Sequence, residues 1–430
     1  MSAIYHTLVY VLFAMIMSIL AFKSAKLQKR PSVGNGQVGI PVERKKSKYV
    51  LRVKKMDKYL WGIIIFFTVI CAIRWCVGTD TLSYTKNFIF GTARNDDDIE
   101  LAMLWIMRLV TSLGLHFSVG LGILAFLEIY FLVKAFQDDR FILIFVPVLM
   151  FGSSYYMDLM NGMRQMIVAC GFLWASKFIV EKKPLPYFLF VAAGFLMHKS
   201  ALLLIPFFFI PNKLKIADKR WVLLTIYLAC FVMGMTPQFQ GLIQSVEKIA
   251  MLLGYEGYVS RVDSYLSGGY SEEALAFGPM QLSYFLIGLF VIWFGPRLKQ
   301  RYEKRVKCFN LWYFLAYFYS CAFFLVCNIS HIFIRPIQYF ELFQMAIASL
   351  LLYEFVSSYK SKRKISPRTR SYSRMLAIAF SCIIWVNTAW GIAKVTIMKG
   401  PGTVDTLTYK VFFMHMDQVR ACKNNPNYTL

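Results

Sequence analysis

Three arginines in this 430-residue chain stand beside other polar residues near the ends of long apolar segments. They are Arg74, Arg164 and Arg335. A guanidinium group stays charged and donates hydrogen bonds in a planar fork, which suits the paired phosphates of a diphosphate. Each arginine alone also fits an anchor for lipid headgroups, but three with polar neighbours favour one shared site. The sequence therefore predicts a diphosphate site formed by these arginines.

A histidine and a lysine interrupt the apolar run 187–210, in the stretch FLMHKSALLLIP. His198 and Lys199 are functional candidates, because ionisable residues at membrane depth are costly to place there. The loops 181–186 and 212–220 on either side are both basic, which predicts that they share one side of the membrane. A helix over this run extends about 36 Å, enough for one crossing and too short for two. We therefore predict a re-entrant pair of short helices that meet near His198.

The alternative for this run is one tilted span, with the Lys199 side chain reaching the membrane surface and the later topology inverted. That inversion would place the basic loops 296–307 and 357–374 outside. The re-entrant pair is therefore favoured.

More polar residues follow the second predicted span. Asp80 and Tyr84 lie in the loop after it, and Glu100 opens the segment 101–110. This segment is too short and too polar to cross a membrane. It is typical of an amphipathic helix at the interface, bearing Arg108.

Two later stretches extend the polar cluster. Asn161, Arg164 and Gln165 are spaced to share one face of a helix start. Arg335 stands at the entrance of another predicted span, with Tyr339 just inside it. The candidate substrate-binding residues are Tyr84, Asn161, Gln165, Lys199, Arg261, His331 and Tyr339.

The composition places these residues on an all-α, polytopic membrane protein. The chain is 58% hydrophobic and only 17% charged, with a mean hydropathy of +0.52. We expect one membrane domain over 1–430, with about ten transmembrane helices besides the re-entrant pair at 187–210. The predicted spans lie near 3–22, 59–77, 117–135, 141–157, 163–180, 221–236, 279–295, 309–328, 337–355 and 375–393.

The net charge of +25 follows the membrane topology. With the first segment as an uncleaved anchor and its N-terminus outside, 34 of the 48 Lys and Arg residues fall in predicted inner loops. This is the positive-inside pattern, so the charge does not call for nucleic acid as a partner. We expect both termini outside, a basic cytoplasmic loop at 23–58 and external loops at 78–116 and 237–278.

The sequence offers little for metal or cofactor chemistry. The nine cysteines include no CxxC pair and most fit apolar fillers, and no histidine pair has zinc spacing. There is no phosphate-binding glycine loop and no serine nucleophile motif. We expect no cofactor and no metal; the open alternative is a divalent cation at the D-x-D spacing of Asp96 and Asp98.

An ordered set of motifs resembles the EpsG family of bacterial exopolysaccharide polymerases, relatives of the Wzy-type polymerases. Each motif alone is weak, and their order on a polytopic background carries the resemblance. The matching residues are GlyThrAsp at 78–80 with Tyr84, then Glu100, Arg164 with Gln165, His198 with Ser200 and Ala201, and Arg335 with Tyr339.

The resemblance implies a GT-C-like membrane glycosyltransferase of the bacterial cytoplasmic membrane. It would act at the outer face on polyprenyl-diphosphate-linked glycans, in the bilayer and alongside other polysaccharide-assembly proteins. His198 would be the first candidate for the base that activates the acceptor hydroxyl, and Asp80 the second. Glu100 or Glu341 would stabilise an oxocarbenium-like transition state. The arginines would then hold the leaving diphosphate.

The alternative function is a transporter that flips lipid-linked oligosaccharides across the membrane. A transport pathway would carry polar residues open to both sides, whereas this sequence concentrates them on the predicted outer half. Glu128 and Glu354 are the exceptions within apolar spans.

Overall fold

The structure is a computed structural model of the chain. It describes residues 3–28, 56–91, 99–153, 155–211, 214–236, 278–327, 331–359, 367–397 and 407–425. Residues 237–277 of the predicted loop 237–278, the motif at 96–98 and most of the loop 23–58 lie outside these residues.

The described residues form helices, joined by a single β-bridge between Arg74 and Val411. This confirms the all-α prediction for the part of the chain that is described. The helices are α1 (Ala3–Leu27), α2 (Lys58–Ala72), α3 (Thr81–Phe90), α4 (Leu101–Ser112), α5 (Phe117–Ala135), α6 (Arg140–Leu143), α7 (Val146–Gly152), α8 (Tyr155–Asn161), α9 (Met163–Val180), α10 (Pro184–Met197), η2 (Lys199–Phe209), α11 (Arg220–Gly234), α14 (Pro279–Trp293), α15 (Gly295–Tyr302), α16 (Phe309–Val326), α17 (His331–Gln338), α18 (Glu341–Tyr359), α19 (Pro367–Ile397), η3 (Phe412–Met414) and α20 (Met416–Asn424).

The outer faces of several helices are apolar. Ile4, Leu8 and Met15 on α1 are more than half exposed, while Tyr10 and Met17 on the opposite face are buried in the core. A stripe of exposed large apolar side chains along a helix fits contact with lipid tails rather than water. Together with the apolar helices, this identifies a multi-pass membrane protein.

Among the described residues, five helices are long and apolar enough to cross a membrane, or seven if each of two bent helix pairs counts as one span. The five are α1, α5, α9, α16 and residues Thr369–Ile397 of α19. Three other predicted spans are the 15-residue helices α2, α11 and α14. Such a helix extends about 22 Å, short of the roughly 30 Å of a hydrocarbon core. The count of ten spans therefore stays a prediction.

The predicted span 141–157 differs most from expectation. It consists of α6, α7 and α8, with a bend of 74° between Arg140–Gly152 and Tyr155–Asn161. α7 ends against α19, where a Cβ atom on Gly152 would lie 2.7 Å from Cγ2 of Ile384. The close approach leaves α8 to run in a new direction toward the start of α9.

The apolar run 187–210 folds back on itself at His198, as predicted. His198 is extended (φ −157°, ψ 118°), so α10 ends before it and η2, a 3₁₀ helix, begins after it. The Tyr187 hydroxyl donates to the Leu204 carbonyl over 2.6 Å, and the Lys182 ammonium donates to the Ile210 carbonyl over 3.0 Å. The two outer ends of this hairpin therefore lie side by side, with His198 at the tip.

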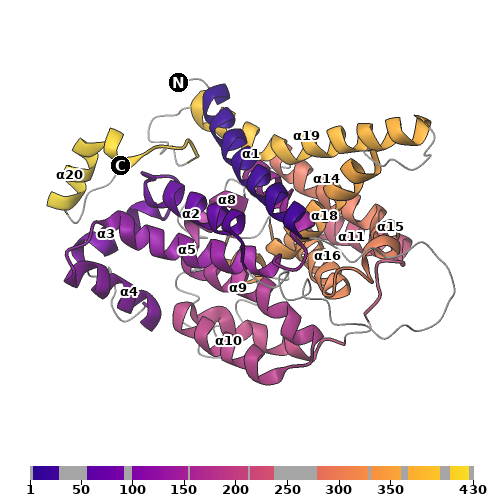
Figure 1. Cartoon of the computed structure of the whole chain (residues 1–430), viewed down its shortest axis with the longest axis horizontal. Coiled ribbons are helices and arrows are strands. Elements are labelled where there is room, and N and C mark those ends of the chain that lie inside the picture. Colours follow the sequence, from indigo (N-terminus) through magenta and orange to yellow (C-terminus); the bar gives the residue numbers. More distant parts are fainter. Residues whose placement is uncertain are drawn as a thin grey trace.

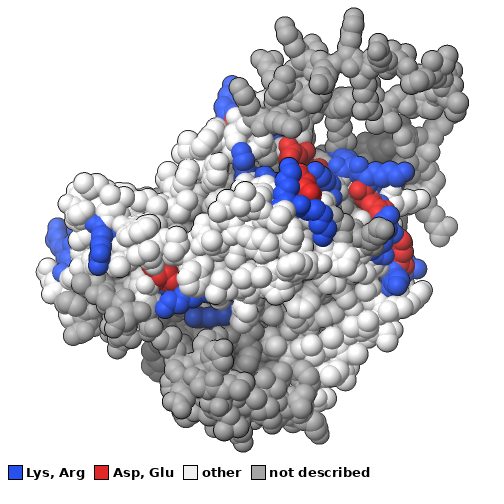
Figure 2. All heavy atoms as spheres, turned by 90° about the horizontal axis from the view of Figure 1, so that it is seen from below, with Lys and Arg blue, Asp and Glu red and all other residues white. Residues whose placement is uncertain are grey.

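The loops predicted to be cytoplasmic meet at one end of the molecule. Ion pairs join loops that are distant in sequence, and although surface pairs add little stability they locate the loops well. In Figure 1, α15 lies at this end, on the right, while α3, α4 and α20 lie at the left. Figure 2 shows charged side chains in groups toward the left and the right, with uncharged surface between them. The pairs are Asp57–Arg140 (2.6 Å), Glu181–Lys307 (2.7 Å), Lys215–Glu303 (3.2 Å) and Asp218–Lys299.

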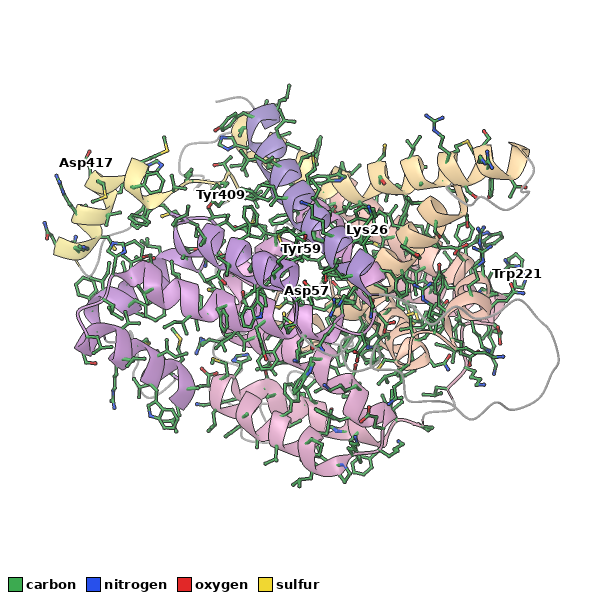
Figure 3. The ribbon with its side chains drawn as sticks, in the orientation of Figure 1. Lys26, Asp57, Tyr59, Trp221, Tyr409 and Asp417 are labelled. Atoms are coloured by element: carbon green, nitrogen blue, oxygen red, sulfur yellow. The ribbon has the colours of Figure 1, made fainter. Side chains whose placement is uncertain are left out.

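The C-terminal segment 407–425 covers the C-terminal end of α2. The Trp75 amide donates to the Lys410 carbonyl and the Phe412 amide to the Ile73 carbonyl, each over 2.9 Å. The Tyr409 hydroxyl donates to the Ile70 carbonyl over 2.7 Å, and Figure 3 places Tyr409 beside α1. The segment 407–425 thus holds the loop after α2 in place.

We expect the two ends of the molecule to face opposite sides of the membrane. In intact cells, a membrane-impermeant maleimide should label the Thr79→Cys variant and leave Lys183→Cys, Lys215→Cys and Lys304→Cys unlabelled until the cells are opened. All four positions are exposed in the structure. The chain without an added cysteine corrects for its natural cysteines. Labelling of positions 183 and 215 from opposite sides would contradict the re-entrant hairpin.

Candidate active site

Glu100 stands where three distant parts of the chain meet. It directly precedes α4. Its carboxylate accepts a hydrogen bond from Nδ1 of His198 over 2.8 Å and forms an ion pair with Arg164. The backbone amide of Lys199 also donates to Oε1 of Glu100, over 3.3 Å. The start of α4, the start of α9 and the tip of the α10–η2 hairpin are therefore tied to one carboxylate.

The environment of Glu100 keeps it ionised. Burial alone would raise its pKa, but the hydrogen bond from His198 and the charge of Arg164 outweigh burial and lower the pKa to about 2. An ionised carboxylate only accepts hydrogen bonds, so Nδ1 of His198 must carry the proton. Nε2 of His198, which has no partner among the described residues, is then free to accept a proton.

The Glu100 cluster is reachable from outside the chain. The side chains of His198 and Arg164 are 24% and 29% exposed, whereas that of Glu100 is 6% exposed. The carboxylate is thus set behind the imidazole and guanidinium groups, which face the approach to the site.

Asp80 lies within the electrostatic reach of two cations. Burial raises the pKa of Asp80, and the charges of Arg335 and Arg164 partly offset this effect. Arg335, on α17, is exposed. Tyr84, on α3, is buried against Arg164. Asp80, Arg164, Arg335 and Tyr84 were predicted from separate segments, and the fold brings them together.

Asn161 holds the loop before α3. Its Oδ1 accepts a hydrogen bond from the Thr79 backbone amide over 2.6 Å. Gly78 in the same loop has φ +89°, and a Cβ atom there would lie 2.6 Å from Oδ1 of Asn161. The glycine therefore permits both the turn and the close approach.

Two more contacts join α9 and the hairpin to α17 and to the turn that follows it. The Gln165 side chain donates to the Arg335 carbonyl. The hydroxyl groups of Ser200 and Tyr339 are 2.7 Å apart. Gln165 and Tyr339 are buried, so they position Arg335 and η2 rather than present free polar groups.

Arg74 differs from the prediction. Its side chain is fully buried and points inward, with its three nitrogens donating to protein groups. The acceptors include the Thr81 hydroxyl (3.4 Å) and the carbonyls of Cys71 (3.2 Å) and Met160 (3.4 Å). Arg74 therefore braces the loop after α2 against the segment before α9, and this burial does not fit a diphosphate ligand.

Other predicted residues lie outside the Glu100 cluster or outside the part of the chain that the structure describes. The Lys199 side chain is exposed, and only its backbone amide touches Glu100. Glu341 is buried next to Asp158, so Glu100 is the carboxylate that contacts His198. His331 lies in α17 with its side chain undescribed, and Arg261 lies outside the described residues.

Three neighbouring residues were not among the predicted site residues. They are Ser200, Asp158 and Gln338, and the last two are joined by a hydrogen bond of 3.2 Å that ties α8 to α17. Asp158 precedes Asn161 by three residues and Ser200 follows His198 by two, so proximity in sequence was the available signal. Gln338 directly precedes Tyr339, so the same signal was available for it.

No three His, Cys, Asp or Glu side chains of the described residues lie close enough to share a metal ion. Asp96 and Asp98, the alternative cation site, lie outside those residues.

The model of the EpsG family matches residues 58–394. The matched range contains every contact of the Glu100 cluster, from the loop after α2 to the start of α18. No match was found among curated proteins or among solved structures.

The close approach at Gly78 predicts a specific loss of stability. Gly78→Ala and Gly114→Ala both place a side chain at positive φ, with φ +89° and φ +61°. Each should lose about 1–2 kcal/mol from this strain. A Cβ atom at Gly114 meets nothing within 4 Å, whereas that at Gly78 meets Asn161 and Met160. Gly78→Ala should therefore lose about 1–3 kcal/mol more, measured by thermal unfolding in detergent. Equal losses would contradict the packing of this loop.

The depressed pKa of Glu100 predicts how stability depends on pH. A carboxylate with a lowered pKa stabilises the fold above its unfolded-state pKa, and the effect is lost as pH falls through the folded value. The Glu100→Gln variant should melt below the parent chain by a near-constant margin above about pH 5. The margin should shrink only as pH falls from 4.5, the ordinary value, toward 2. Asp417→Asn, exposed at the left end in Figure 3, is the control and should show no margin. A margin that disappears between about pH 7 and pH 6 would argue against this assignment.

Proposed function

The chain belongs to the EpsG family, and from this premise and the Glu100–His198 contact we propose that it polymerises lipid-linked oligosaccharide repeat units by glycosyl transfer. Membership of the family indicates an exopolysaccharide polymerase in a multi-pass membrane protein. The proposal adds the reaction, the substrate class and the residues. The donor is a growing glycan on a polyprenyl diphosphate, and the acceptor is the terminal hydroxyl of the next lipid-linked repeat unit.

His198 is the proposed base. The acceptor hydroxyl loses its proton to Nε2 of His198 as its oxygen forms a bond to the anomeric carbon of the donor. The bond from that carbon to the diphosphate oxygen breaks, and the polyprenyl diphosphate leaves with the electron pair. The observation that carries this role is the 2.8 Å hydrogen bond between Nδ1 and Glu100, because with the proton on Nδ1 the neutral imidazole offers Nε2 as its proton acceptor.

Glu100 supports His198 from behind. Its low pKa keeps it ionised, so it holds the imidazole in one orientation and stabilises the positive charge that forms when His198 takes the proton. Glu100 is thus a positioning residue for the base. Asp80 is the second candidate for the base, and burial raises the pKa of its carboxyl group.

Arg164 and Arg335 are the proposed ligands of the leaving diphosphate. Charge develops on the diphosphate as the anomeric bond breaks, and fixed cations stabilise it there. Arg335 is exposed, and the part of Arg164 not engaged by Glu100 is accessible. Both act on Asp80, which supports their lying on one side of the site. Arg74 is not included, because its guanidinium group is buried and engaged within the chain.

The proposed reaction takes place at the outer face of the bacterial cytoplasmic membrane. In Figure 1, the helix α4, which begins directly after Glu100, lies at the left, away from α15 at the basic end, and basic loops stay in the cytoplasm. Lipid-linked repeat units would approach from the bilayer, and other polysaccharide-assembly proteins would supply them or receive the product.

We expect the His198→Asn variant to lose roughly 10²–10⁴-fold of its polymerising rate. Asparagine can still donate a hydrogen bond to Glu100 but offers no base in place of Nε2, so the cluster should hold while proton transfer fails. Arg164→Ala should also abolish polymer. Purified protein with lipid-linked repeat units, followed by separation of products by length, measures the rate, and single repeats should accumulate in cells.

Arg108→Ala is the matched control, because Arg108 is exposed on α4 near the cluster and has no ion-pair partner among the described residues. It should make polymer of normal length. Normal polymer from His198→Asn would remove His198 from the mechanism. A purified chain that moves lipid-linked sugars across vesicles without forming a glycosidic bond would establish the transporter alternative instead.

A further inference from the structure

A second polar site lies at the basic end of the molecule, away from the Glu100 cluster. A cavity of about 570 Å³ opens where the start of α11 meets the junction of α14 and α15. Arg220, Trp293 and Arg297 line it, together with Asp218. We refer to this cavity as the α11–α15 pocket.

Arg220 lines this pocket and has no ion-pair partner among the described residues. Its guanidinium carbon lies 4.6 Å from the ring centre of Trp293 and 5.3 Å from that of Trp221. Its Nε is buried and has no hydrogen-bond acceptor among the described residues. A buried donor without an acceptor is costly, so this nitrogen favours an acceptor that comes from outside the chain.

Arg297 presents the second guanidinium group. Its Nε donates to Glu354 over 2.8 Å and its Nη2 to the Ser358 hydroxyl over 3.0 Å. Nη1 has no hydrogen-bond partner among the described residues, and the side chain is 30% exposed. One edge of the planar fork is therefore held by the protein, while the other is available in the pocket.

The acidic residues nearby do not neutralise this pair. Glu354 is fully buried and already receives Arg297, Arg301 and the Tyr302 hydroxyl. Asp218 is paired with Lys299. Among the described residues, the lining arginines and the cations paired with these two carboxylates number four, which leaves two positive charges in excess; they are Arg220, Arg297, Lys299 and Arg301. The ligand that fits is an anion with several acceptor oxygens.

The surroundings of the pocket are those of a membrane interface. Trp221 and Trp293 are 63% and 41% exposed and pack edge to face, with ring centres 5.6 Å apart. Figure 3 places Trp221 at the right-hand edge of the molecule. Val222 and Ile226 continue an exposed apolar face along α11. Tryptophan is enriched at the level of lipid headgroups, and apolar side chains beside it contact acyl chains.

We propose that the α11–α15 pocket binds the phosphate group of an anionic phospholipid of the cytoplasmic leaflet. Arg220 and Arg297 donate to the phosphate oxygens, the two tryptophans flank the glycerol region, and the acyl chains lie along α11. The lipid would hold the start of α11 to the α14–α15 junction. This site is separate from the proposed glycosyl transfer and does not depend on it.

The test uses the full chain, purified in a neutral detergent. Phosphatidylglycerol should raise its melting temperature in a saturable way, and phosphatidylcholine should not. Arg220→Gln should weaken the apparent affinity for phosphatidylglycerol roughly tenfold to hundredfold, the value of one charge-assisted hydrogen bond. Arg220→Lys keeps the charge but lacks the planar fork, so its apparent affinity for phosphatidylglycerol should fall between those of the parent chain and Arg220→Gln. This variant keeps the test useful if the glutamine variant unfolds.

Arg305→Gln is the matched control. Arg305 lies at the same basic end, stacks on the Phe141 ring at 3.4 Å and does not line the pocket. It should bind phosphatidylglycerol like the parent chain. Equal losses in Arg220→Gln and Arg305→Gln would overturn the site, because they would reflect net charge alone. Inorganic phosphate that protects as well as the lipid at equal concentration would show a site for a free anion and overturn the lipid assignment.

Discussion

The carboxylate of Glu100 is the contact on which the site depends. It accepts hydrogen bonds from the His198 imidazole, the Lys199 amide and the Arg164 guanidinium group, and these come from the hairpin tip and the start of α9. A buried carboxylate needs such donors, because without them burial would favour its neutral form. In turn, the ionised carboxylate determines which nitrogen of His198 carries the proton. One electrostatic requirement thus sets both the arrangement of three chain segments and the chemistry available to them.

The hairpin is the device that brings an imidazole to this place. A continuous helix over 187–210 would carry its centre past the site, whereas the extended backbone at His198 frees the side chain and the following amide. The price is a break in helical hydrogen bonding among apolar helices, and contacts within the hairpin offset it. The Tyr187 hydroxyl serves the Leu204 carbonyl, and Lys182 serves that of Ile210. Backbone groups that would be left bare in lipid therefore find partners inside the protein.

The two ends of the molecule use charge differently. The end with Glu100 has a small number of charged groups, and specific contacts hold them at partly buried positions. The accessible cations Arg335 and Arg164 lie at the surface of this group. At the other end, many Lys and Arg residues pair with loop carboxylates or stack on aromatic rings. Membrane insertion accounts for the excess of cations at the basic end. Among the described residues at the basic end, the α11–α15 pocket combines a cavity, an unpaired guanidinium donor and interfacial tryptophans.

The properties that depend on local composition could be predicted from the order of residues along the chain. Apolar length and the placement of basic loops predicted helices in a membrane, and the positive charge of the loops on both sides of 187–210 predicted the fold-back at His198. The span ranges 117–135 and 163–180 were predicted at their observed bounds, because each is bounded by polar residues. The pairing of polar residues, by contrast, followed from how the helices pack in three dimensions. Arg74 and Arg164 look alike in sequence, yet packing buries the first against Met160 and leaves the second at Glu100. Such contacts depend on how separate helices pack. The spacing of residues along one helix does not determine the distance between side chains on different helices.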